Sequence, residues 1–146
     1  MKLRPAYKRV GMLFSGGPAP SANTVISSVA LNFLDNGIPV IGFYRGYEFL
    51  QDFNINYPKI KKGVHFEELD YSITHVRNER GIYLKTSRAN PGKDIKTIQD
   101  IKDSEKVKKL NNILDAFEYL KIGALISIGG DDTLKTANYL NLLGFP

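Results

Sequence analysis

The sequence predicts an α/β fold, a doubly wound, Rossmann-like parallel sheet with helices on both faces. Short apolar runs at residues 10–14, 38–43 and 124–128 have the composition of buried strands. Apolar residues at helical spacing occur in three places: after the first run, before the last run and after the last run. Strands and helices therefore alternate along the chain. Glycine-rich loops come directly after the first and last strands. Because the carboxyl ends of parallel strands share one edge of a sheet, we expect these loops to meet there and bind a ligand.

The first strand, residues 10–14, leads into a loop over 15–23 and then into a helix with apolar residues at helical spacing over 25–34. Ser21 or Asn23 could cap this helix. The loop has neither the GxGxxG spacing of a dinucleotide site nor the Gly-Lys-Ser/Thr of a P-loop. Taken alone, it is either a ligand loop or a plain connection.

The second strand, residues 38–43, completes a βαβ unit whose crossover should be right-handed. Tyr44-Arg-Gly-Tyr47 follows and places aromatic and cationic side chains on a loop at the strand end. This segment is either a packing loop or one wall of a ligand cleft.

Residues 51–80 are the least periodic part of the chain, and we expect an insertion there. Within it, residues 64–73 could hold a short strand and a short helix. His65 and His75 have no second metal-binding residue at ligand spacing, so we interpret both as packing or surface residues.

Residues 81–84 are predicted to form a short strand that leads towards Arg88. Arg88 lies among small residues just before a turn-forming Asn-Pro pair, where its planar fork of donors could reach a phosphate or remain on the surface. An apolar stripe over 107–120 predicts a core helix.

The last strand enters the segment Gly129-Gly-Asp-Asp-Thr133 and then a helix. The two glycines would let an anion approach the backbone amides, and the helix N-terminus would favour its negative charge. Two adjacent carboxylates would repel that anion unless a divalent cation intervenes or one of them excludes part of a larger ligand. The alternative is an ordinary strand-to-helix turn with Asp or Thr capping.

Composition supports a single globular unit over residues 1–146, with 42% hydrophobic and 24% charged residues. There is no cysteine, so disulfides and thiolate sites are excluded. The formal charge of +5 is spread over dispersed and short basic groups, so we expect no nucleic-acid partner. No apolar run approaches the roughly 20 residues of a membrane span, and the first residues lack a signal peptide's apolar region. We expect a cytoplasmic protein with no membrane partner.

Four segments of the chain are considered together: Ser15-Gly-Gly-Pro-Ala-Pro-Ser-Ala-Asn23, Val40-Ile-Gly-Phe-Tyr-Arg-Gly-Tyr47, Leu84-Lys-Thr-Ser-Arg88 and Ile128-Gly-Gly-Asp-Asp-Thr133. In this order they resemble the phosphofructokinase family. The resemblance implies a glycolytic, usually homo-oligomeric enzyme. By the same resemblance, such an enzyme would transfer a phosphoryl group to the 1-hydroxyl of fructose 6-phosphate with Mg2+, giving fructose 1,6-bisphosphate.

The resemblance also implies roles for individual residues of this donor-binding unit. Gly17 would approach the phosphoryl donor, and Gly130 and Thr133 would complete the donor loop. Arg88 would stabilise charge on the transferring group, and Asp131 would hold Mg2+. These roles suit phosphoryl transfer, where catalysis is mostly positioning and neutralisation of charge.

Two departures from the ATP-using pattern point to pyrophosphate as the donor. Asp132 stands where those members carry glycine, and Pro18 replaces a common aspartate; both resemble the pyrophosphate-dependent branch. We assign Asp132, with Arg88, to the catalytic and donor-binding residues. Its carboxylate narrows the donor pocket and opposes the α-phosphate of ATP, a group that pyrophosphate lacks.

The family's Thr-Ile-Asp-Asn-Asp motif, which holds the general base, does not occur here, and neither do the sugar-binding residues. We therefore expect an incomplete, N-terminal part of a larger two-domain enzyme, inactive on its own. Two alternatives stay open: an ATP-dependent kinase with a Gly-Gly-Asp-x-Thr loop, and a non-catalytic phosphate-binding or interaction domain.

Overall fold

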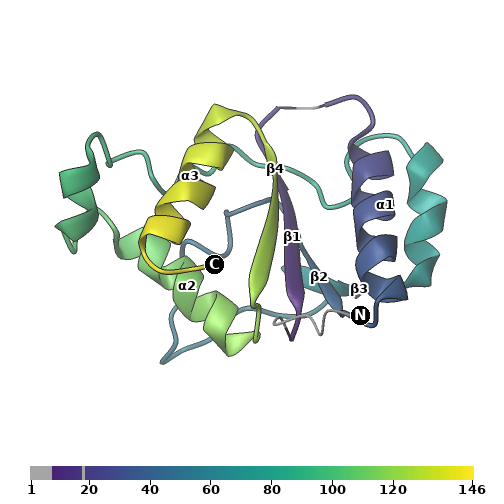
Figure 1. Cartoon of the computed structure of the whole chain (residues 1–146), viewed down its shortest axis with the longest axis horizontal. Helices are drawn as coiled ribbons and strands as arrows, with labels where there is room; N and C mark the ends of the chain where they lie inside the picture. The colour runs from purple at the N-terminus through teal and green to yellow at the C-terminus, as the bar shows by residue number, and fades with distance from the viewer. Residues whose placement is uncertain (1–7, 18) are drawn as a thin grey trace, which may run out of the picture.

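The computed structural model describes residues 8–17 and 19–146 and has three layers (Figure 1). The central sheet has four strands in the order β3-β2-β1-β4. β1 is parallel to β2 and to β4, whereas β3 is antiparallel to β2. The strands are β1 Val10–Ser15, β2 Val40–Phe43, β3 Phe66–Leu69 and β4 Ala124–Gly129. The predicted α/β fold is confirmed, with one antiparallel edge strand added.

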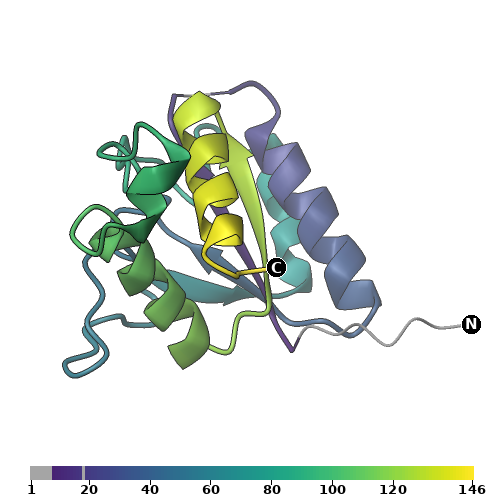
Figure 2. The same cartoon turned by 60° about the vertical axis from the view of Figure 1, so that its left-hand side comes forward.

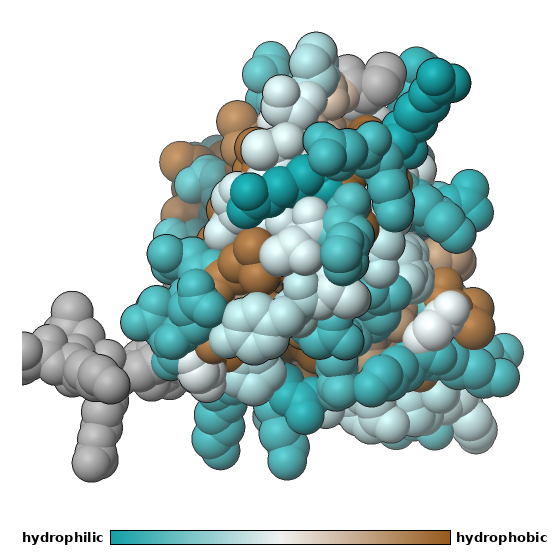
Figure 3. Space-filling model, turned by 90° about the vertical axis from the view of Figure 1, so that its right-hand side faces the viewer, coloured by the Kyte–Doolittle hydropathy of each residue, from teal (hydrophilic) through white to brown (hydrophobic). Residues whose placement is uncertain are grey.

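One face of the sheet is covered by helix α1, Ala22–Asp35, and by the 3-10 helix η1, Tyr71–Asn78 (Figure 1). Met12 and Val40 of the strands pack here against Ile26 and its neighbours. Figure 3 views this side from outside and shows a mainly hydrophilic surface with separate hydrophobic patches. The layer therefore buries its apolar side against the sheet and turns its polar side to solvent.

The other face is covered by α2, Lys108–Tyr119, and α3, Asp131–Leu142, with the short 3-10 helix η2, Ile98–Lys102, beside them (Figure 1). The larger hydrophobic cluster lies here and includes Leu13 of β1 and Phe117 of α2. Consecutive β1 residues thus face opposite layers, as the alternation of side chains along a strand requires. The predicted core helix over 107–120 is confirmed.

The expected caps of α1 are wrong. Ser21 takes the N-cap position in the left-handed region, with φ of 64°, and makes no side-chain cap bond. Asn23 is buried and bonds a different segment: its side chain donates to the Glu79 carbonyl at 3.1 Å and accepts from the Tyr83 N–H at 2.7 Å. Asn23, a residue type that often caps helices, therefore holds the loop at residues 79–83 instead of capping α1.

The predicted strand at residues 81–84 is also wrong, because this segment forms turns. The Tyr83 N–H is bonded by the Asn23 side chain, and the Lys85 N–H bonds the Ile82 carbonyl across a tight turn. β3 already pairs with the outer edge of β2, so the segment packs over the sheet through buried Leu84.

β4 departs from the expected strand buried on both faces. All six of its residues are half-buried, and within residues 8–17 and 19–146 its only strand neighbour is β1. Among the described residues β4 therefore lies at the edge of the sheet, and apolar periodicity alone does not distinguish a central strand from an edge strand.

The irregular region 51–80 contributes to the core as well as to the surface. The strand expected within 64–73 is confirmed as β3, and the expected helix is the 3-10 helix η1, which starts at Tyr71 and runs beyond the expected range to Asn78. Whether the region is an insertion stays a prediction. The His65 ring packs against Phe49 in a tilted arrangement, with ring centroids 4.4 Å apart, as expected for a packing residue. Among the described helices, none is long and apolar enough to cross a membrane.

Tyr47 links the turn after β2 to β4. Its side chain is fully buried, and its hydroxyl is 2.9 Å from the Ser127 hydroxyl. Burial raises the pKa of Tyr47 from its ordinary 10.0 to about 12, although the bond to Ser127 opposes part of that rise. Because the pKa is raised in the folded state, neutral Tyr47 contributes fully to the free energy of unfolding below about pH 10. This contribution is lost as the pH rises towards 12, because the phenol then ionises more readily in the unfolded chain.

Tyr47→Phe should therefore change stability in a pH-dependent way. At pH 7 we expect a loss of about 1 kcal/mol in the free energy of unfolding, from the lost hydrogen bond. Near pH 11 the difference in the free energy of unfolding between the variant and wild type should move by about 1 kcal/mol in favour of the variant, because phenylalanine has no phenol to ionise. Urea unfolding of both proteins at the two pH values tests this, and an identical pH dependence would contradict it.

Candidate functional site

The two glycine loops meet at the carboxyl edge of the parallel strands. Figure 2 shows α1 and α3 starting at the same edge, on opposite sides of the sheet. Ser15 and Gly129 are partners in the β1–β4 register. A Cβ on Gly129 would lie 2.2 Å from the Ser15 carbonyl oxygen and 2.5 Å from Thr133 Oγ1. No side chain fits at Gly129, so this glycine is required by the close approach of the two strand ends.

Thr133 joins the loops from the other side. It is buried, and its hydroxyl donates to the Ser15 carbonyl at 3.3 Å. The N-cap of α3 is Gly130, which has no side-chain cap bond, while Asp131 and Asp132 lie in the first turn. The capping alternative is therefore wrong: the Thr133 hydroxyl bonds the neighbouring strand and not its own helix.

A third loop, residues 84–88, is bonded to the first glycine loop. The Thr86 hydroxyl donates to the Gly16 carbonyl at 2.6 Å, and the Gly16 N–H donates to the Ser87 carbonyl at 2.9 Å. These bonds place Arg88 beside the ends of β1 and β4. Thr86 and Ser87 stand in the segment Leu84-Lys-Thr-Ser-Arg88 that resembles the family, but sequence reasoning assigned no contact to either residue.

A pocket of about 330 Å3 lies where the three loops meet. Four of the predicted site residues line it: Gly17, Arg88, Asp132 and Thr133. Ser15, Gly16, Ala89 and Asn90 complete the lining. Thr133 is buried and Asp132 and Arg88 are exposed, so a cation and an anion reach the pocket from opposite loops.

Two predicted site residues do not line this pocket. Gly130 and Asp131 are exposed at the start of α3, immediately before Asp132. Pro18, the other departure noted in the sequence, lies outside the described residues. The pocket is therefore lined by residues 15–17, 88–90 and 132–133, and Gly130 and Asp131 lie next to it in the sequence.

A second pocket of about 350 Å3 continues from the first and shares Asn90 and Asp132 with it. Three lysines line it: Lys93, Lys96 and Lys135. Sequence reasoning missed this cationic pocket. The available signal was Lys135, which lies one helical turn after Asp132 on α3 and so shares its face.

The Tyr44-Arg-Gly-Tyr47 segment is a packing loop and not a wall of the pocket. Tyr44 and Tyr83 both donate their hydroxyls to the Glu67 carboxylate of β3. Burial, followed by the bond to Glu67 and its charge, raises the pKa of Tyr44 to about 12. Both phenols therefore stay neutral donors that fasten the edge strand to residues 82–85.

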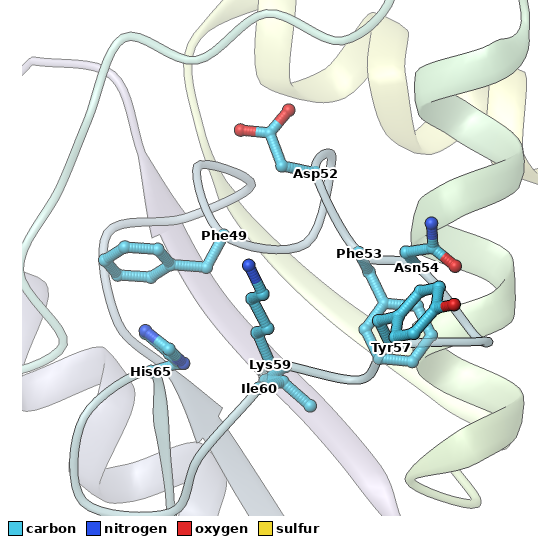
Figure 4. Close-up of a pocket in the computed structure, with 8 residues that line it drawn as sticks. All are labelled: Phe49, Asp52, Phe53, Asn54, Tyr57, Lys59, Ile60 and His65. Carbon is cyan, nitrogen blue, oxygen red and sulfur yellow. The ribbon is translucent and has the colours of Figure 1, made fainter.

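Another pocket, of about 660 Å3, shares no lining residue with the pocket between the loops (Figure 4). Phe49 and His65 lie on one side of it and Phe53 and Tyr57 on the other, with the Lys59 ammonium between them. None of the predicted site residues lines this cavity.

Comparison with known proteins gives consistent results. The family model for phosphofructokinase matches residues 9–145. A pyrophosphate–fructose 6-phosphate 1-phosphotransferase from Thermotoga maritima is 39% identical over 131 residues, which are 90% of this chain and 27% of the relative. An ATP-dependent 6-phosphofructokinase from Clostridium novyi is 34% identical over 137 residues, 94% of this chain and 36% of the relative.

Solved structures agree with the sequence relatives. The crystal structure of Pichia pastoris phosphofructokinase in the T-state matches 96% of this chain and 14% of that chain, with a TM-score of 0.62 and 25% identity. The chain spans about a quarter to a third of the curated relatives' length. Because the family model matches nearly all of the chain and the fold agrees, the chain belongs to the phosphofructokinase family.

Proposed function

We propose that the chain forms the phosphoryl-donor side of an enzyme that phosphorylates fructose 6-phosphate to fructose 1,6-bisphosphate, using pyrophosphate and Mg2+. The main support for this proposal comes from Gly17 and Gly130. A Cβ at either position would have nothing within 4 Å, and neither residue has a positive φ. The fold itself therefore does not require glycine there, in contrast to Gly129. Open backbone beside the pocket suits the close approach of a phosphate to the amides.

The other residues provide charge and position. Arg88 would bind the transferring phosphoryl group with a planar fork of donors, which lowers the energy of the charge that develops on it. The N-terminus of α3 adds a favourable partial positive charge. Thr133 holds the two glycine loops at a fixed separation through its bond to Ser15. This division of roles is that of phosphoryl transfer, where positioning and charge neutralisation dominate.

The carboxylates available here fit Mg2+. The residues that the structure describes contain no group of three or more metal-binding side chains. Mg2+ usually binds one or two carboxylates and completes its shell with water and substrate phosphates. Exposed Asp131 would hold the ion, which when bound neutralises phosphate charge.

Pyrophosphate is the favoured donor because of Asp132. Asp132 lines both pockets. In this proposal the rest of a nucleotide would extend from the first pocket into the second and would pass its carboxylate. A negative charge and a side chain at this point both disfavour ATP. The name of the Thermotoga maritima relative also supports this choice. We further propose that the whole enzyme is cytoplasmic and a homo-oligomer, as is usual for the family.

An ATP-dependent kinase is the second candidate, and one observation favours it. The pocket beyond Asp132 carries Lys93, Lys96 and Lys135, which would attract a further phosphate and offset the charge of Asp132. The name of the Clostridium novyi relative supports this donor. A non-catalytic phosphate-binding domain is the third candidate, because the pocket needs only an anion.

Separate replacement of Gly129 and Gly130 distinguishes a glycine that the fold requires from a glycine that donor binding requires. Gly130→Ala should unfold with a free energy within about 1 kcal/mol of wild type, because its φ of −85° suits alanine. In the full-length enzyme it should raise the donor KM about tenfold, through a methyl group placed where the phosphate approaches.

Gly129→Ala is the matched control. Its methyl group would collide with the Ser15 carbonyl oxygen, so we expect a stability loss at the upper end of about 1–3 kcal/mol. Urea unfolding and steady-state kinetics measure the two effects. A stable Gly130→Ala enzyme with an unchanged donor KM would contradict the proposed donor site.

Asp132→Gly tests the choice of donor. In the full-length enzyme the variant should use ATP better and pyrophosphate worse, with a change in relative kcat/KM of roughly ten- to a hundredfold. One unfavourable charge contact in a partly desolvated site is worth about 1–3 kcal/mol. An unchanged donor ratio would show that Asp132 does not select the donor.

Asp131→Ala is the companion variant for the metal. If Asp131 holds Mg2+, its loss should lower kcat/KM with both donors by a similar factor, because the ion serves either one. Retained activity in this variant would show that the two carboxylates have been assigned in the wrong order.

A further inference from the structure

We propose that Ser87 is a positioning residue that directs Arg88 over the donor pocket, a role that rests on the function proposed above. Residues 84–88 belong to no helix or strand, so their position depends on individual contacts. Arg88 is exposed and has no ion-pair partner in the described part of the chain. The direction of its long side chain is therefore set by the backbone that carries it.

The Ser87 hydroxyl makes bonds on both sides of that backbone. It donates to the Arg45 carbonyl at 2.7 Å and accepts from the Ala89 N–H at 3.3 Å. The first bond fixes the loop to the turn after β2. The second bond closes a small ring around Arg88, since Ala89 is the next residue.

The Ser87 carbonyl is held at the same time by the first glycine loop. It accepts from the Gly16 N–H at 2.9 Å and from the Ser15 hydroxyl at 3.3 Å. Ser87 thus connects three segments: the end of β1, the turn after β2 and the loop that carries Arg88.

The turn that carries Arg45 is held by its own contacts. Arg45 and Gly46 both lie in the left-handed region, with φ of 60° and 61°, and the Arg45 N–H donates to the Leu84 carbonyl at 2.9 Å. A Cβ on Gly46 would lie 2.8 Å from Ser15 Cβ, so this turn is packed tightly on β1. A hydrogen bond to a fixed carbonyl orients the loop more strongly than a bond to a mobile one.

A double-mutant cycle in the full-length enzyme tests the role. Ser87→Ala should lower kcat/KM with pyrophosphate about tenfold, mostly through kcat, because a small misplacement of a charge-stabilising group has a large effect on rate. In an Arg88→Ala background the same substitution should change the rate less than about twofold. Ser87→Thr, which keeps the hydroxyl, should restore most of the activity. Ser104→Ala, at an exposed turn, is the control and should match wild type.

Several results would overturn the proposal. An equal loss from Ser87→Ala with and without Arg88 would show that Ser87 acts on general stability. If wild type is active and Ser87→Ala has the same kcat/KM, the positioning role is refuted while the proposed function stands. If the full-length wild type transfers no phosphoryl group, the proposed function fails and this role fails with it. Ser87→Cys takes the place of Ser87→Ala if circular dichroism shows that the alanine variant does not fold.

Discussion

The close approach of the ends of β1 and β4 is the constraint on which the rest of the site depends. Two backbones meet where a Cβ on Gly129 would lie 2.2 Å from the Ser15 carbonyl oxygen. Thr133 then bonds the same carbonyl from the first turn of α3. This contact brings one glycine loop against the other and directs the start of α3 towards the pocket. The chemistry of the loops therefore depends on a packing requirement at the strand ends.

The two hydrophobic layers hold this contact in place. Ile26 packs on one face of the sheet and Phe117 on the other, so β1 is fixed between α1 and α2. The three loops extend from these layers. The Thr86 hydroxyl bonds the loop 84–88 to the first glycine loop, and the Thr133 hydroxyl bonds the start of α3 to the end of β1. Binding residues on loops held by a rigid scaffold are the usual arrangement in α/β proteins.

Much of the fold could be predicted because its main elements have strong local patterns. Strands β1, β2 and β4 and the helices between them follow apolar periodicity, and the two glycine loops mark the ends of strands. The sequence also predicted which residues approach one another, since Gly17, Arg88, Asp132 and Thr133 line one pocket. Their chemical roles stay proposals.

The errors concern contacts between distant residues. The segment 81–84 has the composition of a strand, yet Asn23, 60 residues away from Tyr83, takes its N–H. The Glu67 carboxylate that binds two tyrosines and the lysines beyond Asp132 come together only through the tertiary fold. A local sequence pattern does not encode contacts between residues that are distant in the sequence.

The central claim is that the three loops form one binding site for a phosphoryl donor. The most direct measurement is a titration of the 15N-labelled chain with magnesium pyrophosphate, followed by two-dimensional NMR. The account predicts that the largest shifts occur at the amides of Gly16, Gly17, Arg88, Gly130 and Thr133, and that they saturate together. No shifts at these amides, or shifts confined to the cavity beside Phe49, would contradict it.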